Sequence, residues 1–226
     1  MKVKASIIIP AYNAQAYLAE TLESCLRQTQ DKIEIIVVND ASTDGTLALA
    51  NFYAAKDPRV KVITYEENRG RSEARNTGCR AAESDVLLMM DSDDIMAPGR
   101  VADTLAAFKK APRIGIVYGK FQVIDALGNL QGIVDANPFD WERLKKEGFA
   151  FICHSTMAFR KSVFKKVQYT SGDYAKHGID DWRFQVDAYK AGVKFAPIRK
   201  VLAQYRFAPK ERDEKRILEL KQEAIG

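Results

Sequence analysis

The chain has 226 residues, with 35 Lys and Arg against 30 Asp and Glu for a net charge of +5, and 46% of its residues are hydrophobic. These values suit one large globular unit and exclude a disordered chain. No apolar run reaches the roughly 18 residues that a membrane-spanning helix needs, and the first one is interrupted at Pro10, so we expect a cytoplasmic protein. Three scattered cysteines and two histidines make no metal cluster, so any bound metal must take oxygen ligands.

The positive charge is concentrated in the second half of the chain and in its tail, over 210–221. Solvated helix faces explain it, and attraction to an anionic membrane surface or to a phosphorylated substrate is the alternative. No basic stripe is interleaved with aromatic residues, so nucleic acid is not an expected partner. The oligomeric state does not follow from the sequence.

The first half alternates regularly between short apolar runs and amphipathic segments. The pattern predicts strands over 6–10, 33–38, 60–65 and 86–90. It predicts helices over 16–28, 71–82 and 98–108, and another that begins after the capping residues 42–44 and ends at about residue 56. Strands alternating with helices of about three turns indicate an α/β fold. We expect a mostly parallel central sheet with helices on both faces.

The second half is less regular. It suggests strands over 114–117, 121–124 and 149–159, a turn over 126–129 into a short strand, an extended segment over 193–205, and helices over 141–147, 162–166, 181–190 and 211–223. No low-complexity linker separates the halves. We therefore expect a single domain, 1–226, made of one half over 1–112, a second over 113–208 and a helical tail over 209–226.

Four polar loops follow the predicted parallel strands, over 10–13, 39–42, 67–71 and 91–94. Loops that leave the carboxyl ends of parallel strands lie along one edge of the sheet. The topology therefore predicts the active site at this edge.

The fourth loop places Asp91, Asp93 and Asp94 within four residues, directly after an apolar strand. Their mutual repulsion favours a bound cation, and oxygen ligands fit Mg²⁺ or Mn²⁺, which also bind phosphates. An acidic turn before a helix is the alternative. Tyr12 offers a ring and Asp40 an acceptor to a nucleobase, although a packed tyrosine and a turn-capping aspartate would look the same.

The sequence has neither GxGxxG after its first strand nor GxxxxGK[ST], so dinucleotide and P-loop sites are unsupported. Its motifs instead resemble those of the family 2 glycosyltransferases, which have the GT-A fold. The matching segments are the opening strand and turn over 6–13, the DxSxDxT-type loop over 36–46, the NxG and ARNxG segment over 68–78, the DxD motif over 91–94 and, more weakly, an acidic pair within 178–182.

The resemblance implies a role for each matching residue. Pro10, Ala11, Tyr12 and Asp40 would hold the nucleoside, with Arg71 near the base or diphosphate. Asp91 and Ser92 would contact the ribose or sugar, and Asp93 would bind the Mn²⁺ or Mg²⁺ cofactor. Asp181 would be the general base of an inverting transfer, with Asp180 as the second choice; helix capping by this pair is the alternative. The first half would then bind the nucleotide-sugar and the second the acceptor.

One departure from the family lies near the end of the chain. Many members have YRxH there, but Tyr205-Arg206-Phe207-Ala208 has no histidine. Arg206 would then act alone on the phosphates, or the contact is missing. His154 is a substitute for that histidine or, alternatively, a core residue.

These features favour a metal-dependent transferase that moves a sugar from a nucleotide-sugar, most simply a UDP-sugar, to a saccharide or glycolipid acceptor, as in polysaccharide or cell-envelope glycan synthesis. The basic tail suggests peripheral contact with the inner face of the membrane. Two alternatives stay open: a sugar-phosphate nucleotidyltransferase and a non-catalytic nucleotide-sugar-binding module.

Overall fold

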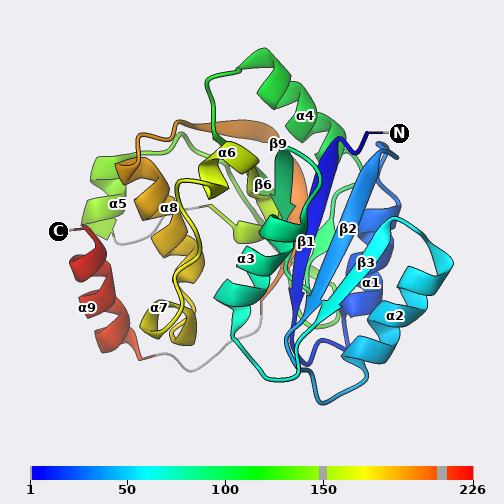
Figure 1. Cartoon of the computed structure of the whole chain (residues 1–226). Coiled ribbons are helices and arrows are strands. Elements are labelled where there is room, and N and C mark those ends of the chain that lie inside the picture. The colour runs from blue at the N-terminus through cyan, green and yellow to red at the C-terminus, as the bar shows by residue number, and fades with distance from the viewer. Residues whose placement is uncertain (1, 148–151, 208–212, 226) are drawn as a thin grey trace.

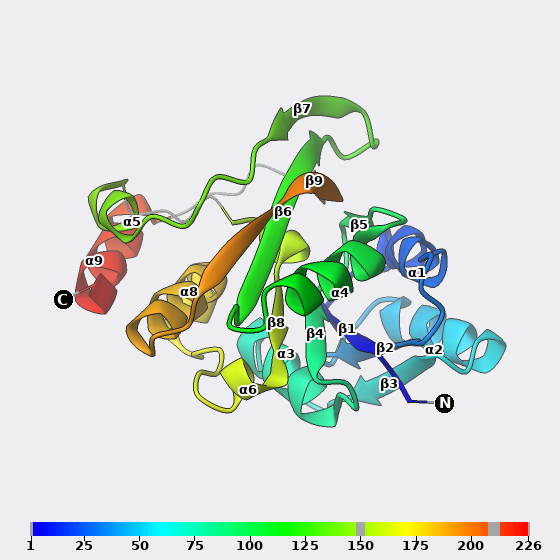
Figure 2. The ribbon, with the colours of Figure 1, turned by 90° about the horizontal axis from the view of Figure 1, so that it is seen from above.

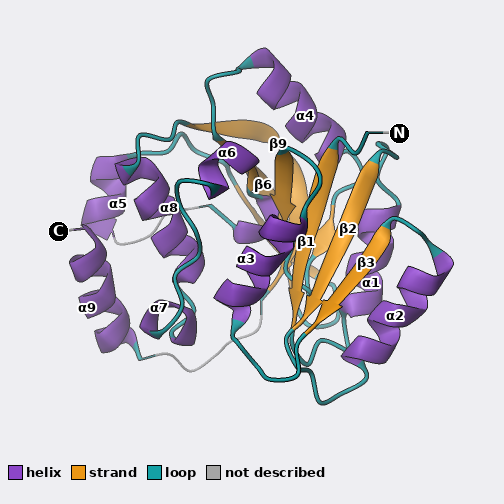
Figure 3. Ribbon diagram, in the orientation of Figure 1, coloured by secondary structure: helices purple, strands orange, loops and turns teal. Residues whose placement is uncertain are grey.

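The computed structural model describes residues 2–147, 152–207 and 213–225. A mixed sheet runs through the molecule in the order β3-β2-β1-β4-β8-β6-β9-β5, with β7 paired to β6. Figure 1 shows the strands at the centre with helices on both sides, and Figure 3 separates helices from strands by colour. The sheet thus contains strands from both halves of the chain.

Four parallel strands form the first half of the sheet: β1 (Ala5–Ala11), β2 (Ile33–Asn39), β3 (Val60–Thr64) and β4 (Val86–Met89). They are connected by α1 (Leu18–Leu26), α2 (Thr46–Lys56) and α3 (Arg71–Ala81), and α4 (Arg100–Lys110) follows the short strand β5 (Ile95–Met96). The predicted α/β architecture and its mostly parallel sheet are confirmed in this half.

Alternation along β1 explains why both faces of the sheet are covered. Ile7 and Ile9 belong to one apolar core with Leu18 and Leu22 of α1, whereas Ile8 belongs to a second core on the side of α3. Successive side chains of a strand point to opposite faces, so a continuous apolar run of this kind requires helices on both sides.

A glycine allows α3 to lie close to the sheet. A Cβ atom added at Gly78 would lie 2.4 Å from Cγ2 of Ile8, a core residue of β1. The close approach fixes the position of α3, whose first turns face the predicted site.

We expect Gly78→Ala to lower the free energy of unfolding by about 1–3 kcal/mol, because the added methyl group overpacks the contact with Ile8. Gly132→Ala is the matched control, since no atom lies within 4 Å of a Cβ there, and it should change stability by less than about 0.5 kcal/mol. Urea denaturation measures both. Equal stability of the two variants would contradict the close packing.

The second half of the sheet is mixed. β6 (Ile116–Ile124) pairs in parallel with β9 (Phe195–Arg206) and antiparallel with β7 (Leu130–Val134) and β8 (Ala158–Arg160). Seen from above in Figure 2, β6 and β7 extend away from the first four strands.

Two predictions in this half are wrong in detail. The strands expected over 114–117 and 121–124 are the single strand β6, because Gly119 does not end the strand but makes room for Leu202 of β9. Of the strand expected over 149–159, residues 149–151 lie outside the described residues, His154–Thr156 form a 3-10 turn and β8 only begins at Ala158. The expectations for 126–134 and 193–205 are confirmed.

The remaining helices lie beside this half of the sheet. They are α5 (Trp141–Glu147), α6 (Lys161–Phe164), α7 (Asp173–Lys176), α8 (Asp180–Lys190) and α9 (Glu214–Ile225). Ile217 and Leu220 of α9 pack with Trp182 and Val186 of α8. Among the described residues, no helix is long and apolar enough to cross a membrane.

Candidate active site

The carboxyl ends of β1, β2 and β4 bring the first group of predicted residues to one edge. Tyr12, Asp40 and Asp91 follow these three strands, which are parallel neighbours in the order β2-β1-β4. The predicted convergence of the loops at one edge is therefore confirmed, while the roles of the residues stay predictions.

The ends of β1 and β2 are bonded to one another. Pro10 and Ala11 are buried, and the Asp40 N–H donates to the Ala11 carbonyl at 2.9 Å. The Asp40 carboxyl group is buried as well, and one of its oxygens accepts from the Arg69 N–H at 2.6 Å. Tyr12 is 51% exposed. This arrangement offers a ring at the surface beside a fixed acceptor, which suits a planar ligand.

Strained backbone lies next to these residues. Asn13 and Ala41 have φ angles of +49° and +55°, in the left-handed region. The Asn13 N–H donates to Ser42 Oγ at 3.0 Å, and Asn13 Oδ1 accepts from the Thr43 N–H at 2.9 Å. Left-handed alanine is unfavourable and persists only where its surroundings impose it. The two loops therefore hold one another in place.

Asp91 is held by two cationic or polar side chains. Its Oδ1 lies 2.8 Å from Nη2 of the buried Arg75 and 3.5 Å from Nδ1 of His154. Burial acts to raise the pKa of Asp91, but Arg75 and His154 outweigh burial and lower that pKa below its usual range. Asp91 is therefore ionised and fixed in direction.

Asp94 faces the protein interior. It is fully buried, and its Oδ1 accepts the Arg206 N–H at 2.7 Å, which attaches the acidic loop to β9. Burial and the charges of Asp91 and Asp93 raise the pKa of Asp94 well above its usual value. The carboxylates of the acidic loop therefore repel one another, and a bound cation would reduce this repulsion.

Ser92 and Asp93 are half-buried members of the same loop. Within the described residues, no group of three or more His, Cys, Asp or Glu side chains is placed to hold a metal ion by itself. The loop still fits Mg²⁺ or Mn²⁺, because such ions take one or two carboxylates and complete their coordination with phosphate oxygens and water.

The acidic pair Asp180 and Asp181 begins α8, and the two residues have different surroundings. Asp180 is fully buried, and its Oδ2 lies 2.6 Å from Arg75 Nη1 and accepts from Ser72 Oγ at 3.1 Å. Asp181 is half-buried, and its Oδ1 accepts the Trp182 N–H at 2.8 Å. Burial raises the pKa of Asp181, Asp180 adds to this effect, and His154 and Arg75 oppose it. Ile179 is the N-cap residue, so neither acid is the cap itself, but both lie in the first turn of α8 and Asp181 accepts one of its N–H groups.

Arg71 lies at the first position of α3 and reaches towards the same acidic pair. Its Nη2 donates to the Ala175 carbonyl at 3.1 Å, and its Nε lies 3.3 Å from Asp180 Oδ1. The side chain is 44% exposed. Arg71 thus contacts the segment before α8 and keeps part of its guanidinium towards solvent.

Arg206 does not fit the role predicted for it. Its guanidinium is 4% exposed and makes four hydrogen bonds, to the carbonyls of Asp93, Asp125 and Ala126 and to Glu20 Oε2. A guanidinium committed in this way holds the acidic loop and the β6–β7 turn together, and it is not directed at a phosphate. The sequence shows that an arginine stands at this position but not which groups its guanidinium contacts.

We expect Arg206→Gln to lower the free energy of unfolding by about 2–4 kcal/mol, because it removes a buried guanidinium from three loop carbonyls and a carboxylate. Arg27→Gln is the matched control: Arg27 pairs with Glu23 and both side chains are exposed, so its effect should stay below about 0.5 kcal/mol. Chemical denaturation compares the two. Unchanged stability together with lost UDP affinity would return Arg206 to the donor site.

Sequence reasoning did not single out Arg75, which joins the site, and it left His154 as either a substitute histidine or a core residue. Arg75 connects Asp91 to Asp180, and His154 lies between Asp91 and Tyr169, whose hydroxyl is 2.9 Å from His154 Nε2. The ARNxG segment contained the signal for Arg75. His154 is buried as a core residue would be, but its ring faces the Asp91 carboxylate.

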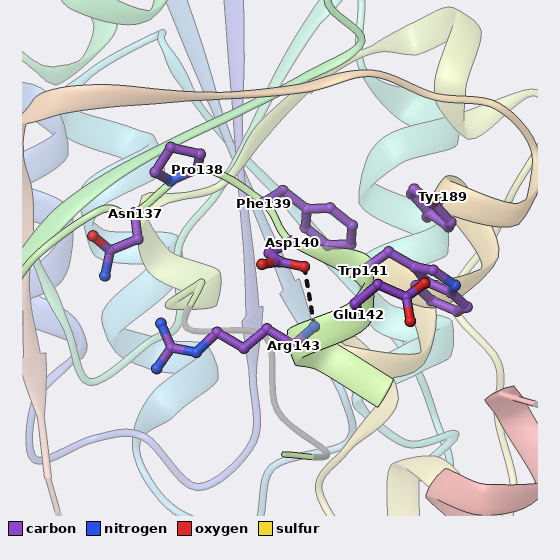
Figure 4. Close-up of a pocket in the computed structure, with 8 residues that line it drawn as sticks. All are labelled: Asn137, Pro138, Phe139, Asp140, Trp141, Glu142, Arg143 and Tyr189. Carbon is purple, nitrogen blue, oxygen red and sulfur yellow. Dashed lines mark hydrogen bonds between the residues drawn. The ribbon is translucent and has the colours of Figure 1, made fainter. Parts of the chain in front are cut away.

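A shallow cavity of about 650 Å³ lies elsewhere, where α5 begins and α8 ends. Figure 4 shows Phe139, Trp141 and Tyr189 in its wall, near Asp140 and Arg143. Trp141 and Tyr189 are stacked with ring centroids 4.4 Å apart. None of the site residues predicted from the sequence lines this cavity.

Comparison with solved structures defines the class of fold. The chain superimposes on Staphylococcus aureus TarS in complex with UDP with a TM-score of 0.74 at 22% identity, covering 98% of this chain and 65% of that one. A mannosyltransferase from Pyrobaculum calidifontis, in complex with GDP-Man and Mn²⁺, gives a TM-score of 0.67 at 21% identity, covering 94% of this chain and 59% of that one. The fold is the GT-A fold of nucleotide-sugar transferases.

The sequence comparisons give the family. Residues 6–168 match the model of glycosyl transferase family 2, and the chain belongs to this family. It is 33% identical to Escherichia coli chondroitin synthase over 73% of this chain and 25% of that protein. It is 31% identical to an uncharacterized glycosyltransferase of Haemophilus influenzae over 82% of this chain and 71% of that protein. The chain thus spans only a quarter of the chondroitin synthase.

Proposed function

We propose that the chain is an inverting, metal-dependent glycosyltransferase that moves a sugar from a UDP-sugar to a hydroxyl group of a saccharide or glycolipid acceptor. The observation that carries this proposal is the position of Arg75, which contacts Asp91 on the donor edge and Asp180 at the start of α8. Asp91, which is assigned to the donor, and Asp180, which directly precedes the assigned base Asp181, are thereby held on either side of one side chain.

Donor binding is assigned to the edge formed by β1, β2 and β4. Tyr12 would lie against the base, Asp40 would accept from it, and Pro10 and Ala11 would form the floor. Asp91 and Ser92 would contact the ribose or sugar, and Arg71 the diphosphate. The fixed Asp40 carboxyl group and the exposed Tyr12 ring support this assignment.

Asp181 is assigned as the general base. It is half-buried with a raised pKa, and a raised pKa makes a carboxylate a stronger base. Asp180 is fully buried against Arg75 and cannot receive a proton from an acceptor in that position. Proton removal by Asp181 would accompany in-line attack of the acceptor hydroxyl, which inverts the anomeric centre.

Asp93 is assigned as the protein ligand of Mn²⁺ or Mg²⁺. A bound divalent ion would stabilise the charge of the departing diphosphate. Asp91 and Asp94 are held in their orientations by Arg75 and by the Arg206 N–H, so the acidic loop presents Asp93 at a fixed place.

The proposal also assigns a task to each part of the chain. Residues 1–112 would bind the nucleotide-sugar, 113–208 the acceptor, and 209–226 would form a helical tail with a role in peripheral membrane contact. A place in polysaccharide or cell-envelope glycan synthesis follows from the same proposal and from the kind of relative that the chain matches.

Incubation of the protein and Mn²⁺ with a panel of nucleotide-sugars and saccharide acceptors tests the proposal. Release of a nucleoside diphosphate with transfer to the acceptor supports a glycosyltransferase. In a parallel incubation with a nucleoside triphosphate and a sugar phosphate, release of pyrophosphate would instead show a nucleotidyltransferase. Binding without turnover, across the whole panel, would indicate a non-catalytic module.

A further inference from the structure

One face of α3 contacts both the donor edge and the segment that leads into α8. We propose that this face is a bracket that positions Asp181, and that Arg75 and Asp180 are positioning residues in it. The inference rests on the proposed function, because it concerns how the assigned base is placed against the donor loop.

Four side chains from the first turns of α3 form the face. Ser72, Arg75 and Asn76 follow Arg71 by one, four and five positions, a spacing that puts the four residues on one side of a helix. Ser72, Arg75 and Asn76 are buried. A buried polar face on a helix requires partners from a neighbouring segment.

That segment lies between residues 169 and 180. Asn76 pairs with the backbone of Tyr169 through two hydrogen bonds of 2.9 Å, one to the N–H and one to the carbonyl. Ser72 Oγ donates to the Thr170 carbonyl at 2.9 Å, and Arg71 donates to the Ala175 carbonyl at 3.1 Å. The chain entering α8 is thus fixed to α3 at three points before Asp180 is reached.

Arg75 completes the bracket on the donor side. Its Nη1 lies 2.6 Å from Asp180 Oδ2, and its Nη2 lies 2.8 Å from Asp91 Oδ1. The two ends of one rigid, planar guanidinium therefore set the spacing between the donor loop and the first turn of α8. Asp181 is the next residue along the chain, so its place relative to the donor follows from this spacing.

The bracket gives the acidic pair two distinct functions. Asp180 holds the helix and Asp181 performs the chemistry. Loss of the Asp180 charge should therefore slow transfer by displacing Asp181, while Arg75 remains paired with Asp91 and the donor site is preserved.

A double-mutant cycle on Arg75 and Asp180 tests this inference, with donor affinity and turnover measured separately. For Asp180→Asn we expect donor affinity within about threefold of the wild type and a kcat about 10²-fold lower, the scale of a displacement of about 1 Å. Arg75→Gln should lower both quantities. Asp85→Asn, which changes an exposed acid before β4 and outside the bracket, is the control and should leave both unchanged.

The double variant gives the deciding result. If Asp180 acts through Arg75, the kcat of the double variant equals that of Arg75→Gln within about threefold. The inference would be overturned if the two single losses in kcat multiplied in the double variant. It would also be overturned if donor affinity fell as far in Asp180→Asn as in Arg75→Gln. If Arg75→Gln does not fold, Arg75→Lys replaces it, because lysine cannot span both carboxylates.

Fluorescence provides a readout that does not depend on turnover. The chain has two tryptophans, so Trp141→Phe leaves Trp182, which is buried and whose backbone N–H donates to Asp181. In that background, Asp180→Asn and Arg75→Gln should increase quenching of Trp182 by acrylamide. Unchanged quenching would refute the bracket, whereas a wild type that transfers no sugar would refute the proposed function alone.

Discussion

Asp181→Asn is expected to lower kcat by about 10²–10⁴-fold with donor affinity retained, since the amide keeps the size of the side chain but cannot accept the acceptor proton. The side chain is half-buried at the start of α8, and its Oδ1 already accepts the Trp182 N–H. An asparagine can keep that hydrogen bond through its own carbonyl oxygen, so the helix should stay in place. Steady-state transfer assays and donor calorimetry separate the two effects.

The pH dependence adds a second measurement to the same variant. Burial, assisted by Asp180, raises the pKa of Asp181, and a base must be deprotonated to act. The wild-type kcat/KM should therefore fall as pH decreases through this raised pKa, at a higher pH than an ordinary aspartate would give, about 3.9. Asp181→Asn should abolish this acid limb.

The control variant for the base is Asp187→Asn. Asp187 lies on the same helix and pairs with Arg183, and both side chains are about one quarter exposed. Its removal should leave turnover and the acid limb intact. Near-normal turnover of Asp181→Asn would place the base elsewhere. If Asp180→Asn abolished the fall of kcat/KM at low pH, Asp180 would be identified as the base instead.

The first half of the fold was predictable because its signals are local. β1, β2 and β4 are largely apolar runs, and turn residues precede the helices that follow them, so the main elements and their order could be predicted, although the short β5 was not. The edge that holds Tyr12, Asp40 and Asp91 then follows from the parallel topology alone. Sequence motifs supplied the proposed roles.

The second half resisted prediction because its structure depends on contacts distant in sequence. Gly119 looks like the end of a strand, but it lies inside β6 where Leu202 packs against it. The apolar run before β8 contains His154, whose ring faces Asp91 and Tyr169. An apolar pattern cannot distinguish such a segment from a strand.

The candidate site shows the same limit at the level of single residues. Tyr-Arg near the end of the chain indicated a phosphate ligand at Arg206, yet the structure gives that guanidinium four protein acceptors. The residue type predicted that a guanidinium would bind an acceptor here, and only the fold could show which carboxylate or carbonyl oxygen accepts from it. Arg75 is the opposite case, since its motif was visible but its two partners lie 16 and 105 positions away.

Asp93→Ala is expected to remove the Mn²⁺-dependent part of UDP affinity, a loss of at least about tenfold or ~1.4 kcal/mol, and to leave the fold intact. The reason is that only the carboxylate is deleted: the link between this loop and Arg206 uses the Asp93 carbonyl, which alanine retains. Asp85→Ala is the matched control, because Asp85 is exposed and precedes β4, at the opposite end of that strand. Calorimetry of UDP binding with and without Mn²⁺ measures the difference. If Mn²⁺ strengthens UDP binding equally in Asp93→Ala and in the wild type, the ion is held by other groups. The repulsion that adds to burial in raising the pKa of Asp94 would then have no connection with metal binding.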